Sequence, residues 1–392
     1  MRLVLLSSLY GVLSGAVTAL CLWAMKNLQH LLWTDVSAHW QIGALIVTGG
    51  ALIALVRHWL PQGSVQQLLH EVHDPVQHQS RWVLAVILTA VLAVAFGGAV
   101  GPEAGLIAVV LELSTLTALR LSRDRAQQRQ LVEVAVTASL SAWYGSPPAA
   151  AQVAQTEEQT PKPLLWWAGF MGLLGFGMTA QHVLGGGIHK LPLPGHTPAG
   201  DGSDLLWALL PALMGVAIGL AFAWLQPKCQ SALAHAGHPI AQTMAGTLAF
   251  ACMAAAWPAL RFSGHHELAE LPDWFAASGA WPMLALAVLK VLALSLCLAS
   301  GWLGGAIFPM LMAGGCAGLA SLGMWPEIPA AVALGAGMSA AASVGIGKPV
   351  LVVLIVVFFA GANTLPAACM GGLLAHLALR RWPHLNTHPH TV

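Results

Sequence analysis

The chain has 392 residues, of which 57% are hydrophobic and only 8% are charged. Soluble domains carry about a quarter charged residues, so this composition excludes an ordinary soluble fold and predicts a membrane protein. The formal net charge of +1 provides no basic surface for nucleic acid. We therefore expect no nucleic-acid partner, and no sequence feature calls for a cofactor.

Apolar runs follow one another along the chain with only short polar breaks between them. A helix needs roughly 20 apolar residues to cross the hydrocarbon layer, and several of these runs reach that length. Since no polar block longer than a loop occurs, we predict one transmembrane domain over 1–382 and a disordered tail over 383–392. Helices are expected over 3–32, 42–60, 82–99, 106–121, 131–144, 149–158, 164–182, 205–225, 239–260, 281–299, 310–322, 326–344, 349–359 and 365–379.

A glycine-rich break, Gly97 to Gly105, interrupts the apolar sequence before the helix expected at 106–121. Its glycines leave backbone N–H groups uncovered, and Pro102 suits the first turn of a helix. A helix that begins there points bare N–H donors and the positive end of its dipole at one spot, which attracts an anion. In a membrane such a break is tolerated only where it is buried in protein or lines a cavity.

A second break, Ser300 to Pro309, repeats this pattern roughly 200 residues later. An apolar helix ends, glycines expose the backbone, and Pro309 falls near the start of the next helix. Inverted repeats with a binding site between them are common in transporters. We therefore predict an all-α polytopic protein of two inverted halves, approximately 1–183 and 203–382, whose broken helices meet at mid-membrane.

Both breaks resemble signatures of the CLC family of chloride channels and chloride–proton exchangers. The first, Gly98-Ala99-Val100-Gly101-Pro102, is similar to the family's Gly-[Lys/Arg]-Glu-Gly-Pro. The second, Gly304 to Pro309, matches Gly-Gly-x-Phe-x-Pro except that Ile307 replaces the phenylalanine. The similarity extends thinly from about residue 60 to 361. Within the family, the chain most resembles a bacterial branch of ion-channel candidates that carries Gly-Pro-Glu after the first break.

The resemblance implies a homodimeric, multi-pass protein of the bacterial inner membrane, in which each subunit carries its own anion pathway through the lipid bilayer. Helix N-termini would meet near the membrane centre, where backbone N–H groups and a serine hydroxyl hold chloride or another small anion. The positions that the resemblance assigns to the pore are Ser64, Gly98, Ala99, Val100, Gly101, Pro102, Gly305, Ala306, Ile307 and Phe308.

The chain departs from the family where protons are concerned. Val100 stands in the position of the gating glutamate, and valine can neither plug the pathway nor carry a proton. The family's pore tyrosine has no counterpart, because the only tyrosines are Tyr10 and Tyr144. Two carboxyl groups are candidate proton carriers: Glu157, at the family's inner relay position, and Glu103, about one turn beyond Val100. The simpler interpretations are a solvated helix end for Glu157 and a helix-dipole partner for Glu103.

These features predict first of all a passive channel for chloride or a similar anion. Backbone N–H groups at 99–101 and 306–308, with a hydroxyl such as that of Ser64, would replace the water that the anion sheds. The first alternative is a proton-coupled exchanger that uses Glu103 or Glu157. Under that alternative an imposed pH gradient drives the anion uphill.

The second alternative is an intramembrane enzyme, which needs a nucleophile and a base facing each other. Ser300 and His376 are the only candidates and their spacing does not support a pair, so we expect no enzymatic activity and no catalytic residue. Lys290, inside an apolar run, is expected to be structural. His70 and His73 could bind a metal, but we expect an ordinary pair of loop histidines and no metal site.

Overall fold

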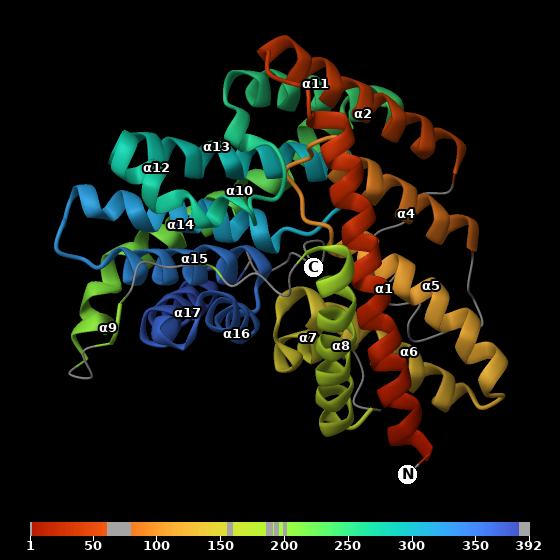
Figure 1. The fold of residues 1–392 in the computed structure, drawn as a ribbon. Coiled ribbons are helices and arrows are strands. Elements are labelled where there is room, and N and C mark those ends of the chain that lie inside the picture. The colour runs from red at the N-terminus through yellow and green to blue at the C-terminus, as the bar shows by residue number, and fades with distance from the viewer. Residues whose placement is uncertain are drawn as a thin grey trace.

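The computed structural model describes residues 2–60, 80–154, 160–185, 191, 196–198 and 202–383. Within these ranges every regular element is a helix, and the one β pairing is an isolated bridge between two glycines (Figure 1). The predicted all-α fold is therefore confirmed. The helices are α1 (Arg2–Trp33), α2 (His39–Trp59), α4 (Ser80–Ala95), α5 (Glu103–Leu121), α6 (Arg125–Tyr144), α7 (Pro147–Ala154), α8 (Lys162–Val183), α9 (Ser203–Trp207), α10 (Leu209–Ala234), α11 (Pro239–Ala256), α12 (Leu271–Ser278), α13 (Ala280–Ala299), α14 (Ile307–Ala320), α15 (Ala330–Ile346), α16 (Pro349–Ala360) and α17 (Leu365–Arg381).

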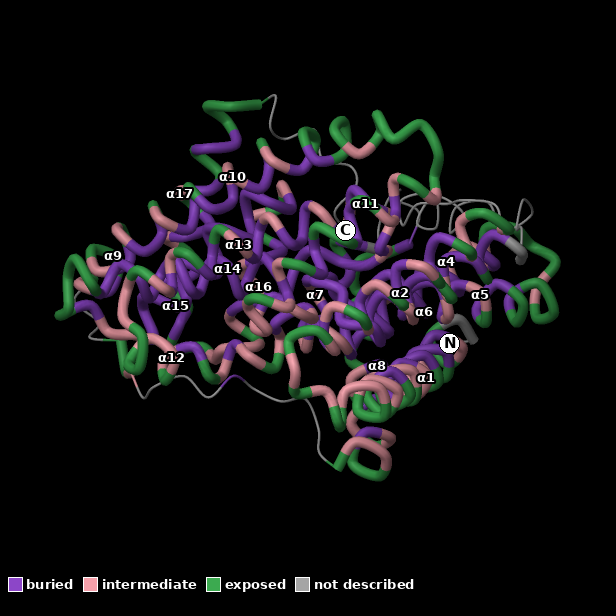
Figure 2. Tube along the Cα trace, turned by 90° about the horizontal axis from the view of Figure 1, so that it is seen from above, coloured by how far each residue is buried: buried purple, intermediate pink, exposed green. Residues whose placement is uncertain are grey.

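Eight helices of the described part are long and apolar enough to cross a membrane. Large apolar side chains stand on the outside of the bundle, among them Leu31, Trp59 and Trp281. The shorter helices α14 and α15 have no polar face, and all of their residues except Ala330 are buried, as expected for helices that are hydrophobic all round. Figure 2 shows the buried segments gathered in the middle of the molecule and the exposed ones around its rim.

The packing of helices is repeated between the two halves of the chain. In the first half α1 packs against α6 and α8, and α5 packs against α4 and α6. In the second half α10 packs against α15 and α17, and α14 packs against α13 and α15. The pairs α2–α11 and α7–α16 join the two sets. The predicted repeat is thus confirmed in the order of its helices, whereas the limits of the halves and of the domain stay predictions.

Helix boundaries at the two breaks differ from those predicted. α4 ends at Ala95 and not at residue 99, because the backbone turns left-handed at Gly97. α5 begins at Glu103 and α14 at Ile307, about one turn earlier than expected, so the residues directly after each break are already helical. Pro102 is the cap residue before α5 rather than a residue of its first turn. The polar stretch after residue 260 also contains α12, which was not predicted.

Glycines allow α1 and α8 to lie side by side (Figure 1). A Cβ atom added to Gly15 would collide with the carbonyl oxygen of Gly172, and one added to Gly175 would collide with the carbonyl oxygen of Val12. Small residues that bring two helix backbones together are typical of membrane bundles, where apolar burial does not drive helices together. This contact therefore depends on the absence of side chains.

Gly175→Ala is expected to destabilise the protein by about 1–3 kcal/mol, because the backbone opposite cannot move aside. Gly177→Ala, in the same helix, is the matched control, since its new Cβ has no heavy atom within 4 Å. That control should keep or raise the melting temperature, because alanine favours a helix over glycine. Thermal unfolding in detergent measures both variants, and equal melting temperatures would contradict the packing described.

Candidate functional site

The two breaks are built alike. Each has a glycine in the left-handed region at or next to its start, Gly97 (φ 84°) and Gly301 (φ 87°). In each, the N–H group of the next residue donates to the carbonyl five residues earlier, at 2.8 Å in the first break and 2.9 Å in the second. This hydrogen bond and a left-handed glycine define the Schellman end of a helix. Gly301 lies 204 residues after Gly97, and the start of α14 lies 204 residues after the start of α5.

The breaks meet at Gly101 and Gly305, which also lie 204 residues apart. The N–H of Gly101 donates to the carbonyl of Gly305 at 2.8 Å, and the N–H of Gly305 donates to the carbonyl of Gly101 at 3.0 Å. The pair is antiparallel. Equivalent residues that pair in opposite directions are what an inverted relation between the two halves produces. The predicted meeting of the two broken helices is therefore observed.

The sequence predicted that the N–H groups at 99–101 and 306–308 all face the anion. In the structure, some N–H groups around the bridge are already used. Those of Gly101 and Gly98 are used within the breaks themselves. Among the described residues, no backbone acceptor takes the N–H groups of Val100, Ile307 and Phe308. Within the same part of the chain, those of Ala99 and Ala306 have no backbone acceptor either, and the backbone of Ala99 contacts the thiol of Cys297. The donors open to a ligand thus include those of Val100 and the first turn of α14. The remaining predicted pore positions, Ala99, Pro102 and Ala306, are buried beside them.

Glu103, the first residue of α5, places its carboxyl group directly over the bridge. Its side chain is only 2% exposed, and a Cβ on either Gly101 or Gly305 would collide with the carboxyl. Among the described residues neither carboxyl oxygen has a partner in hydrogen-bonding geometry, although the indole of Trp143 and the phenol of Tyr144 lie nearby. A carboxyl group thus already occupies the place at which the helix N-termini point.

Val100, in the family's gating position, is 1% exposed and packs against Gly304. Its side chain carries no ionisable group, so the only carboxyl that the described residues bring to the bridge is the one three residues later, in Glu103. The sequence identified Glu103 as a candidate, but it did not show that the side chain turns back onto the glycines.

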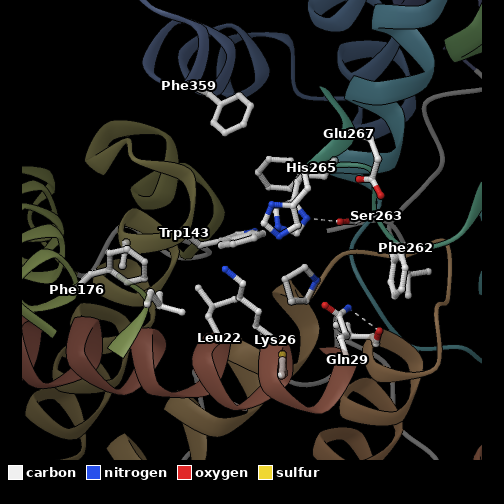
Figure 3. A pocket seen from close by; sticks show the side chains of 18 residues that line it. Leu22, Lys26, Gln29, Trp143, Phe176, Phe262, Ser263, His265, Glu267 and Phe359 are labelled. Atoms are coloured by element: carbon white, nitrogen blue, oxygen red, sulfur yellow. Dashed lines mark hydrogen bonds between the residues drawn. The ribbon is translucent and has the colours of Figure 1, made fainter. Parts of the chain in front are cut away.

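A cavity of about 290 Å³ lies beside the bridge (Figure 3). Val100, Pro102 and Phe308 form the part of its wall next to the bridge. Lys26 and other residues of α1 line it, as do Trp143 of α6 and residues 262–263 and 265–267. The ring of Phe308 packs against that of Trp143, with 5.1 Å between centroids. A space for a small ligand therefore reaches from α1 to the N-terminus of α14.

The segment 259–267, called here the cavity loop, is held by Lys290. This fully buried ammonium group donates to the carbonyl oxygens of four consecutive residues, 259–262, at 2.9–3.4 Å. Burying a charge is costly unless hydrogen bonds satisfy it. The N–H of Phe262 in turn donates to the carbonyl of Gly97 at 3.0 Å. Lys290 is therefore structural, as predicted, and it ties the cavity loop to the first break.

Side chains that the sequence did not single out satisfy the carbonyl ends of the broken helices. Gln29 and Trp33 of α1 donate to the last two carbonyls of α4, at 2.8 and 2.9 Å. Arg57 of α2 donates to the carbonyl of Ser300 at 2.7 Å, directly after α13. Such carbonyls have no partner within their own helix. The sequence indicated these contacts only weakly, through single polar residues at the ends of apolar runs.

Other predicted residues fall outside the described part of the chain or lie away from the bridge. Ser64, Glu157 and the histidine pair at 70 and 73 lie outside the described residues. Ser300 is buried and its hydroxyl donates to the carbonyl of Leu296 at 2.6 Å, whereas His376 is exposed on α17. Within the described chain no hydrogen bond joins these two side chains, so the structure provides no nucleophile–base pair from them.

Comparisons with known proteins agree with this architecture. The family described as "Voltage gated chloride channel" matches residues 49–380. The "Putative ion-transport protein YfeO" of Escherichia coli (strain 55989 / EAEC) is 28% identical over 354 residues, which cover 84% of this chain and 82% of that protein. A slow cyanobacterial Cl⁻/H⁺ antiporter superimposes with a TM-score of 0.75 at 16% identity, over 99% of both chains. A CLC-type fluoride/proton antiporter gives 0.72 at 15% identity, over 95% of both. These two structures show a shared fold.

Gly305→Ala is expected to destabilise the protein by about 1–3 kcal/mol, because its Cβ would enter the space of the Glu103 carboxyl. Adding Glu103→Ala should recover most of the loss, with a coupling free energy of about 1 kcal/mol or more. Gly304→Ala is the control, since its Cβ would meet Val100 and the backbone of Gly101, and Glu103→Ala should not rescue it. Thermal unfolding of the wild type, the three single variants and the two double variants measures these changes in stability. Additive effects of Gly305→Ala and Glu103→Ala would mean that the carboxyl is elsewhere.

Proposed function

This chain belongs to the voltage-gated chloride channel family, and we propose that it exchanges chloride for protons, with Glu103 as the proton carrier. The coarser part of this statement follows from the family: the chain is a multi-pass membrane protein that transports a small anion. The finer part, exchange rather than passive flow, is supported by the position of one carboxyl group.

That observation is the placement of the Glu103 carboxyl over the bridge of Gly101 and Gly305. A charged carboxylate and a transported anion repel each other strongly when both are buried a few ångströms apart. Protonation removes the charge of the carboxyl and with it the conflict. Anion binding at the bridge and the protonation state of Glu103 are therefore coupled, and such coupling is reciprocal.

Selectivity for a small anion is supported by the kind of donors left at the bridge. The N–H groups of Val100, Ile307 and Phe308 and the positive ends of α5 and α14 replace lost water without adding a full positive charge. A fixed cation at the same point would bind the anion too tightly to release it. The two structural relatives carry chloride and fluoride against protons by their descriptions, which supports a halide as the substrate.

The second candidate function is the passive chloride channel, and the observation that favours it is Val100. The residue in the gating position has no ionisable group and is packed against Gly304. Under this alternative Glu103 is a fixed partner of the α5 dipole. Anion flux would then be independent of any proton gradient.

The two candidates are separated by chloride flux from vesicles that contain the purified protein. We expect a pH gradient to drive chloride uphill in the wild type, and Glu103→Gln to abolish that coupling, because an amide cannot carry the proton. Glu112→Gln is the matched control in the same helix, three turns from the bridge by sequence, and should keep the coupling. Wild-type flux that ignores the pH gradient would favour the channel. Coupling that survives Glu103→Gln would assign the proton to another group.

We further propose, from the family, a homodimer in a bacterial inner membrane with no enzymatic activity. The apolar side chains on the outer faces of the helices support a lipid surface around the subunit. The hydroxyl of Ser300, which is bonded to its own helix, supports the absence of a catalytic role for that residue.

A further inference from the structure

We propose that the cavity beside the bridge holds a second anion site in which Lys26 supplies the positive charge, so that a small monovalent anion rests there before it reaches the bridge. The proposal rests on the proposed transport function and adds a site and a residue to it. Neither the sequence motifs nor the donors at the breaks include Lys26, which lies in α1, far from both breaks in the sequence.

The geometry connects Lys26 with the bridge through one continuous space. Lys26 lies on the cavity side of α1, between Leu22 and Gln29, and in Figure 3 its side chain points from α1 into the cavity. The same cavity is lined by Val100 and Phe308, whose N–H groups are among those left for a ligand. An anion attracted by Lys26 therefore enters the space that leads to these donors.

The charges around the cavity favour an anion. Glu267 is the one carboxylate among the described residues that line it, and this group lies within electrostatic reach of both Arg261 and Lys290. The two imidazoles of the cavity loop, His265 and His266, stack with 3.8 Å between centroids and carry either no charge or a positive one. Three cations, Lys26, Arg261 and Lys290, thus stand in and around the cavity against two carboxyl groups, that of Glu267 and that of Glu103 at the bridge, and the field attracts small anions.

Lysine is suited to a site from which the anion must move on. Its ammonium group is a compact and strongly hydrated point charge, so it attracts an anion without holding it in a fixed fork of hydrogen bonds. Lys26 is exposed, so its charge stays in contact with water at the wall of the cavity. Such a group raises the local concentration of the anion and thereby the rate of its capture.

The test compares chloride uptake at increasing chloride concentration for Lys26→Gln, Lys26→Arg and a control, Lys228→Gln. Lys228 lies over the ring of Trp224 in α10 and does not line the cavity. We expect Lys26→Gln to raise the half-saturating chloride concentration roughly three- to tenfold with little change in the maximal rate, as for loss of one steering charge. Lys26→Arg should stay near the wild type, and Lys228→Gln should not differ from it. The effect of Lys26→Gln should shrink at high ionic strength, because salt screens an exposed charge.

An unchanged half-saturating concentration in Lys26→Gln would overturn the proposal, as would an equal shift in Lys228→Gln. A fall in maximal rate alone would show that Lys26 has only a structural role. Bromide in crystals provides a readout that does not depend on transport: an anomalous peak beside Lys26 is expected in the wild type and not in Lys26→Gln. A bromide peak without proton-coupled flux would contradict the proposed exchange but support the anion site at Lys26. Proton-coupled flux without a bromide peak would support the exchange but contradict the site at Lys26.

Discussion

The two hydrogen bonds between Gly101 and Gly305 bring four helix ends to one place. α4 and α13 stop just before this bridge, and α5 and α14 start just after it. The positive ends of the latter two helices and their unbonded N–H groups therefore collect around a pair of residues without side chains. A carboxyl group, that of Glu103, fills the space that two Cβ atoms would otherwise take. The breaks thus create a buried position for negative charge out of backbone alone.

Side chains satisfy the carbonyl groups at the negative ends of the broken helices, whereas N–H groups at the positive ends stay unbonded. Gln29, Trp33 and Arg57 donate to the carbonyl groups after which α4 and α13 stop. Lys290 likewise satisfies four carbonyls of the cavity loop. Because side chains neutralise the carbonyl groups, the field left open at the bridge is that of the N–H groups. In the proposed exchange, an anion and the Glu103 carboxylate compete for this field, and protonation of Glu103 favours the anion.

Much of this arrangement could be predicted from composition and from the two breaks. Long apolar runs predict a membrane bundle, and glycines beside Pro102 and Pro309 predict helices that begin at depth. The residues at which the helices end and begin at the breaks could not be predicted from the sequence, because left-handed turns at Gly97 and Gly301 end the helices before the apolar pattern ends. The supporting contacts were also hidden: Arg57 and Ser300 are 243 positions apart, and no local pattern connects residues at such a separation. The position of the Glu103 carboxyl depends on a missing side chain in the other half of the molecule, which only the fold reveals.

The central claim is that the transported anion and the negative charge of Glu103 exclude each other at the bridge. Calorimetric titration of the purified protein with chloride, repeated in buffers that differ in ionisation enthalpy, counts the protons bound with each anion. Linkage requires proton uptake when anion binding demands that the carboxylate be protonated. The account predicts that chloride binding takes up protons in the wild type and takes up none in Glu103→Gln. Chloride binding by the wild type without any exchange of protons would contradict it.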